Sequence, residues 1–133
     1  MLPTAKIIRS TFLATIVSVI FMTSAYSQEL RANSPKEKIV LSKVAALPEV
    51  QQRAREIRLK SKGKTQITLM VSAQPDINIP YYQVNVNDNA PSYDNYYQFA
   101  VDPKTYEIFY YNAKTNRQYS LTEWRKQRNK AYK

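Results

Sequence analysis

The chain of 133 residues contains no cysteine and no histidine, and it has only one glycine. Because cysteine is absent, no disulfide can stabilise the fold, and a hydrophobic core must do so alone. The lack of histidine and cysteine removes the commonest general base, the thiol nucleophile and the usual zinc ligands. One glycine is also too few for a glycine-rich phosphate-binding loop. We therefore predict a protein that is not an enzyme and carries no cofactor.

Carboxylates are the remaining candidates for chemistry, and they show no diagnostic pairing for a hydrolase. The loop over residues 85–95 offers Asp88, Asp94 and neighbouring asparagines as oxygen ligands for Ca²⁺. It lacks the ligand spacing and the central glycine of an EF-hand loop. The sequence thus favours an ordinary solvated loop and predicts no metal site.

The N-terminal segment has the three parts of a Sec-type signal peptide. Lys6 and Arg9 give it a positive start, residues 11–22 form an apolar run, and Ala25 and Ser27 are the small residues of a cleavage site. The alternative is a membrane anchor, but the apolar run is short for a bilayer span. We predict cleavage after Ser27 and a periplasmic or secreted protein with no stable membrane span afterwards.

Basic residues outnumber acidic ones by 20 to 10, which gives a net charge of +10. The excess lies at the two ends, because residues 28–64 carry ten basic and four acidic side chains and residues 104–133 carry eight and two. Residues 65–103 hold four aspartates and no lysine or arginine. In an exported protein, cationic ends favour an anionic envelope polymer, an acidic protein or a lipid surface over nucleic acid. A solvated basic face that only maintains solubility is the simpler interpretation.

Residues 35–61 have the start signals and the apolar spacing of helical structure. Ser34 and Glu37 form a capping box, with a proline at the first helical position between them. Pro48 either kinks this helix or begins a second one. Gly63 follows a cationic last turn and marks the end of the helical region.

After Gly63 the apolar spacing changes from helical to alternating, which predicts strands. A tight turn at residues 102–105, with proline at its second position, joins the last two strands. A second capping box at residues 120–123 begins a short C-terminal helix. The predicted strands are residues 65–71, 80–86, 96–101 and 106–112.

This order of elements predicts a two-layer α+β domain. An N-terminal kinked helix, or two helices, packs on one face of a four-stranded antiparallel sheet, and a short C-terminal helix completes the fold. We predict a single domain over residues 35–128, with a flexible tail at residues 28–34 and a basic tail at residues 129–133.

Aromatic residues are the distinctive feature of the predicted sheet. In QFAVDPKTYEIFYYN (98–112), Phe99 and Ile108 belong to the predicted core, so the alternating aromatics face outward and form a candidate partner surface. The alternatives are that the C-terminal helix covers this surface with Leu121 and Trp124, or that the surface forms a homodimer. The candidate partner-binding residues are Tyr81, Tyr96, Phe109, Tyr111 and Trp124, with Met70 beside them.

Three short motifs resemble small exported PepSY-like domains of the β-lactamase-inhibitor/PepSY type. They are VAALPEV (44–50), VDPKTYEI (101–108) and SLTEWRK (120–126). The second is similar to the family's final hairpin, V-D-x-x-T-G-x-I, except that Tyr106 replaces the glycine, which is unfavourable where a turn needs a positive φ. The resemblance, over about residues 40–126, implies a helix packed on an antiparallel sheet and no catalysis. A cystatin-like fold, with a similar element order, is the alternative.

The resemblance also implies a restraint on peptidases or other envelope enzymes, and it assigns no functional residue. We predict an exported binding module that binds or inhibits a periplasmic or extracellular protein, such as a peptidase, through the aromatic sheet face. The alternative is a structural envelope-associated protein that holds an anionic polymer through its basic ends. Salt-sensitive retention on cell-wall material would favour this alternative.

Overall fold

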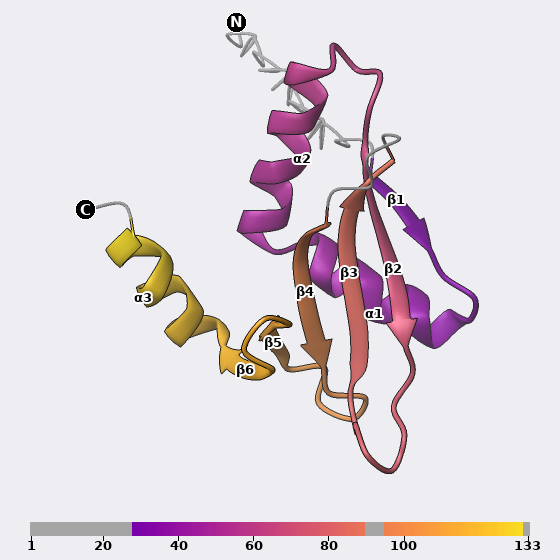
Figure 1. Cartoon of the computed structure of the whole chain (residues 1–133). Coiled ribbons are helices and arrows are strands. Elements are labelled where there is room, and N and C mark those ends of the chain that lie inside the picture. The colour runs from indigo at the N-terminus through magenta and orange to yellow at the C-terminus, as the bar shows by residue number, and fades with distance from the viewer. Residues whose placement is uncertain (1–27, 90–94, 132–133) are drawn as a thin grey trace, which may run out of the picture.

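The computed structural model describes residues 28–89 and 95–131, which form one six-stranded sheet and three helices (Figure 1). The predicted signal peptide and residues 90–94 of the predicted loop lie outside the described residues. The strands follow one another across the sheet in chain order, with β1 parallel to β2 and all other neighbours antiparallel. The elements are β1 (Gln28–Arg31), α1 (Pro35–Ala45), α2 (Pro48–Lys60), β2 (Ile67–Ala73), β3 (Tyr82–Asp88), β4 (Asn95–Val101), β5 (Ile108–Asn112), β6 (Arg117–Ser120) and α3 (Leu121–Ala131).

The predicted four-stranded antiparallel sheet is wrong, because each edge of the sheet has a further short strand. β1 lies in the stretch predicted to be a flexible tail, and β6 lies between the last predicted strand and the predicted C-terminal helix. Their sequences, QELR and RQYS, are four residues long and mostly polar, so neither shows the alternation that predicts a strand. β1 runs parallel to β2 because α1 and α2 lie between them in the chain and provide the long connection that a parallel pair requires.

The helical region consists of two helices, which settles the choice that the sequence left open at Pro48. α1 ends at Ala45, and Pro48 occupies the first turn of α2, where a missing N–H costs no hydrogen bond. The chain leaves α2 through Gly63, whose φ of +79° allows its N–H to donate to the Arg58 carbonyl at 2.8 Å.

The serine bond of each predicted capping box forms, at the starts of α1 and α3. Ser34 Oγ accepts the backbone N–H of Glu37 at 3.1 Å, and the Glu37 carboxylate accepts the backbone N–H of Asn33, at 3.1 Å, in place of that of Ser34. At α3, Ser120 Oγ accepts the backbone N–H of Glu123 at 3.1 Å. Local sequence therefore determines where these helices begin.

The hydrophobic core lies between the helices and one face of the sheet. The helix-facing residues of β2, β3 and β4 are buried, and they pack against the apolar sides of α1 and α2. Trp124 of α3 extends the same core. Its buried members include Val40, Leu41, Val44, Leu47, Val50, Ile67, Leu69, Val84, Val86, Phe99 and Val101.

The turn between β4 and β5 places Tyr106 at a φ of +59°. Asp102 Oδ1 accepts the backbone N–H groups of Thr105 at 3.0 Å and Lys104 at 2.7 Å, and these bonds hold the pKa of Asp102 below its ordinary value. The Tyr106 ring is half-buried, and Lys43 Nζ lies 5.4 Å from its centroid. A tyrosine thus occupies the left-handed position at a backbone cost of roughly 1–2 kcal/mol.

We expect the Tyr106→Gly variant to be more stable than the Tyr106→Ala variant by about 1 kcal/mol. Both variants lose the same ring contacts, and only glycine removes the cost of the positive φ. Equilibrium unfolding in urea measures the difference directly. Equal stabilities, or a more stable alanine variant, would show that this turn carries no backbone strain.

Candidate functional site

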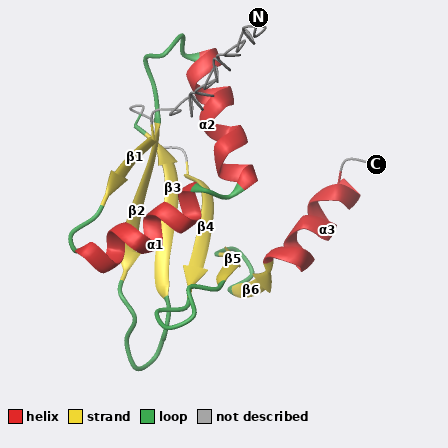
Figure 2. Ribbon diagram, turned by 180° about the vertical axis from the view of Figure 1, so that it is seen from behind, coloured by secondary structure: helices red, strands yellow, loops and turns green. Residues whose placement is uncertain are grey.

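One face of the sheet carries no helix in the described part of the chain. Figure 1 views this face with α1 behind the strands, and Figure 2 shows α1 crossing the opposite face. The residues of β2 to β6 and the adjoining Tyr81 that point to the uncovered side are uncharged and combine amides, hydroxyls and aromatic rings. At the β1 edge the same side carries the ion pair of Glu29 and Arg31. We call this surface the open face; it consists of Thr68, Met70, Tyr81, Gln83, Asn85, Asn87, Gln98, Ala100, Phe109, Tyr111, Gln118 and Ser120.

The aromatic part of the open face is ordered by contacts between neighbouring strands. The Tyr81 and Phe109 rings meet edge to face, with centroids 5.7 Å apart. Ala100 is paired with Phe109 in the sheet and is 4% exposed. The Tyr111 hydroxyl donates to Asn116 Oδ1 at 2.6 Å. A hollow of about 240 Å³ lies beside these groups and is lined by Asn78, Ile79, Pro80, Tyr81, Gln83, Ala100, Tyr111, Asn116 and Gln118.

Of the predicted contact residues, Tyr81, Phe109 and Tyr111 share the open face. Tyr96 does not, because the register of β3 and β4 shifts between Val86 and Asn87 and interrupts the alternation. Its ring lies on the helix side, 5.0 Å from Arg53 Cζ of α2.

Trp124 is also on the helix side of the sheet. It is 4% exposed, stacks on Tyr110 and meets the edges of Tyr97 and Phe99, which all point away from the open face. The alternative in which the C-terminal helix covers the outer aromatics with Trp124 is therefore wrong. α3 extends the helix layer and leaves the open face uncovered by the described residues (Figure 1).

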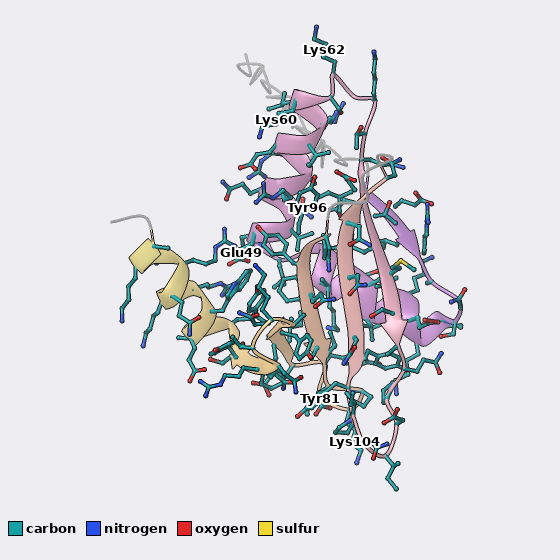
Figure 3. All side chains as sticks on the ribbon, in the orientation of Figure 1. Glu49, Lys60, Lys62, Tyr81, Tyr96 and Lys104 are labelled. Carbon is teal, nitrogen blue, oxygen red and sulfur yellow. The ribbon has the colours of Figure 1, made fainter. Side chains whose placement is uncertain are left out.

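The two basic segments of the sequence lie side by side through an ion pair between α2 and α3. Arg125 Nε donates to Glu49 Oε1 at 2.5 Å and Arg125 Nη2 to Glu49 Oε2 at 3.3 Å, and Figure 3 shows Glu49 on the side of α2 nearest α3. Burial raises the pKa of Glu49, but the hydrogen bonds and the positive charges of Arg125 and Arg128 outweigh it and leave the pKa below 4.5. The basic residues of the two helices are Arg53, Arg55, Arg58, Lys60, Arg125, Lys126, Arg128 and Lys130.

The sequence did not predict a polar cleft that lies between these two helices. A signal for its α2 side was present, because Glu49, Gln52, Arg53 and Glu56 have the spacing of one helix face. No local signal places Arg128 of α3 opposite that face. The pairing depends on Trp124, which anchors α3 to the sheet.

Among residues 28–89 and 95–131, no three carboxylates gather closely enough to hold a metal ion. No helix in the same residues is both long and apolar enough to cross a membrane. Of the two aspartates considered as Ca²⁺ ligands, Asp88 is buried and its Oδ2 accepts the Tyr96 hydroxyl at 2.6 Å, while Asp94 lies outside the described residues.

No protein family, curated protein or solved structure matches this chain. The resemblance to PepSY-like domains therefore stays a prediction.

Proposed function

We propose that this protein is an exported, non-catalytic module that binds a protein partner through the open face. The observation that carries the proposal is a helix-free sheet surface whose part on β2 to β6 is uncharged and contains three half-buried aromatic rings, Tyr81, Phe109 and Tyr111. The cores of protein interfaces are depleted in charge and enriched in tyrosine, phenylalanine and methionine. The open face also contains a methionine, Met70.

The polar residues of the open face support a protein partner as well. Asparagine, serine and tyrosine supply adaptable hydrogen bonds and rigid contact area in antibody binding sites. Here Gln83, Asn85, Gln98 and Gln118 surround the rings. The hollow of about 240 Å³ beside Tyr81 has room for a projecting side chain of a partner.

The charge distribution separates this face from the cationic helices. An anionic polymer would be attracted to α2 and α3, on the other side of the sheet. The open face itself is uncharged, and the arginine of the neighbouring β1, Arg31, is already paired with Glu29. The PepSY-like resemblance implies an envelope peptidase as the class of partner. The open face would bind such a partner through shape complementarity and hydrogen bonds.

Affinity capture with immobilised protein tests the proposal on envelope extracts and culture medium of the source cells. We expect a specific protein to be retained, and we expect Gln98→Arg to weaken its retention at least tenfold, because a charge then stands in the middle of the contact. Phe109→Ser removes one ring and should weaken retention similarly. Retention is quantified by titrating the captured protein against each variant.

The matched control is Leu59→Ser, which removes an exposed apolar side chain, 78% accessible, from α2 rather than from the sheet. It should retain the partner as the unchanged protein does. Thermal unfolding of each variant separates loss of contact from loss of fold. Retention that is equal in all variants, or recovery of no specific protein, would overturn the proposal, and dimerisation abolished by Gln98→Arg would identify a second copy as the occupant instead.

A further inference from the structure

A polar cleft of about 150 Å³ lies between α2 and α3, above β4. Its α2 side is formed by one helix face, its floor by Tyr97 and its α3 side by Arg128. The lining residues are Glu49, Gln52, Arg53, Glu56, Tyr97 and Arg128.

Two guanidinium groups reach this cleft from different helices and are held in place by aromatic rings. Arg128 Cζ lies 4.8 Å from the Trp124 ring centroid, and Arg128 Nη1 donates to the Tyr97 hydroxyl at 3.4 Å. Arg53 Cζ lies 5.9 Å from the Tyr97 ring and 5.0 Å from the Tyr96 ring. Planar guanidinium groups fixed on rings lose little freedom when a ligand binds.

The hydrogen-bonding capacity of these groups is incompletely used. Arg53 Nη1 donates to Glu56 at 3.1 Å, whereas its Nε–H is buried without an acceptor among the described residues. The Tyr97 hydroxyl oxygen accepts from Arg128 and keeps its own proton as a donor. Since unpaired buried donors are unfavourable, an added acceptor at this point would be stabilised.

The lining of the cleft is balanced, with two arginines against two glutamates, and Arg125, which pairs with Glu49 from α3, adds one positive charge. Arg125 pairs with Glu49 and Arg53 pairs with Glu56, while no ion pair found among residues 28–89 and 95–131 involves Arg128. One surplus charge matches a monovalent anion. A dianion would carry more negative charge than this surplus can balance, and the two glutamates would repel the excess.

We propose that the cleft between α2 and α3 binds a single carboxylate group, with Arg128 and Arg53 as its cationic partners and Tyr97 as an additional donor. Arginine forks match the geometry of a carboxylate, which supports this class of ligand. The source of the group is a peptide C-terminus or an organic acid. The site is on the helix side of the sheet and does not depend on the function proposed for the open face.

NMR titration of the purified protein at constant ionic strength tests the site with three probes. They are N-acetylalanine, its neutral amide and propionate. We expect N-acetylalanine to shift the side-chain Nε–H signals of Arg53 and Arg128 in a saturable way, with a midpoint on the order of 1–10 mM for so small a ligand. The amide should bind at least tenfold more weakly. If propionate binds as tightly as N-acetylalanine, a bare carboxylate is sufficient for binding. If propionate binds more weakly, the site recognises a peptide C-terminus.

Matched variants distinguish a built site from general attraction to a basic surface. Arg128→Gln should weaken binding at least tenfold, and Lys130→Gln, which removes the same charge from an exposed position of α3, should leave it unchanged. Arg53→Gln provides a second test from α2 if the first variant alters the packing of α3. The proposal would be overturned if Lys130→Gln weakened binding as much as Arg128→Gln, or if the amide bound as tightly as N-acetylalanine. Tighter binding of inorganic phosphate than of N-acetylalanine would also overturn it.

Discussion

Replacing Trp124 with alanine is expected to lower the free energy of unfolding by about 3–5 kcal/mol. The indole is 4% exposed and stacks on Tyr110, with centroids 4.6 Å apart and an interplanar angle of 8°. It also meets Tyr97 and Phe99 edge to face, each at 5.6 Å. Because Trp124 is the buried residue of α3, its removal leaves a cavity and releases this helix from the sheet.

Urea unfolding measures this loss, and amide hydrogen exchange shows whether α3 opens separately. Lys126→Ala is the control on the same helix, since Lys126 is exposed and its replacement should change the stability by no more than about 0.5 kcal/mol. A loss below about 1 kcal/mol for Trp124→Ala would contradict the packing of α3 on the sheet. It would also remove the support for Arg128 in the cleft.

Phe99 and Phe109 are expected to differ strongly in their effect on stability, although both belong to the β4–β5 hairpin. Phe99→Ala should cost about 3–5 kcal/mol, because the ring is fully buried and contacts Tyr97, Tyr110 and Trp124. Phe109→Ala should cost about 1 kcal/mol, because the ring is half-exposed on the open face and its ring contact is with Tyr81.

Thermal and urea unfolding of the two variants under identical conditions provide the measurement. The difference depends on the register of β4 and β5, in which Phe99 is paired with Tyr110 and Ala100 with Phe109. Slipping the register by one residue would exchange the two faces. Similar losses for both variants would therefore contradict this register, and with it the assignment of Phe109 to the partner surface.

Much of the helix layer could be predicted from the sequence because its signals are local. The cap at Ser34, the proline at the start of α2 and the glycine after it each act on backbone groups within a few residues. Alternation likewise predicted the core side of β2 to β5, and the buried positions of Phe99 and Val101 confirm it. Burial of every second residue leaves a visible pattern in a strand that has one face in the core.

The edge strands could not be predicted, nor could the face of the sheet on which Tyr96 and Trp124 lie. Both depend on partners distant in the sequence. β1 and β6 are stabilised by hydrogen bonds to their neighbours, and these bonds are available to almost any side chain. One register shift beside Asn87 was enough to move Tyr96 to the helix side. Trp124 packs into the core because α1 and α2 do not cover the helix side of the sheet beside Tyr110.

For this protein, the sequence by itself determined the absence of disulfides and thiol chemistry, the outer limits of the helical regions and the apolar side of the central strands. Each follows from composition or from contacts over a few residues. Only the tertiary structure decided which aromatic rings form the open face and that Arg53 and Arg128 line one cleft. These two residues are 75 positions apart, and their approach depends on strand register and on the burial of Trp124, which are properties of the whole packed core.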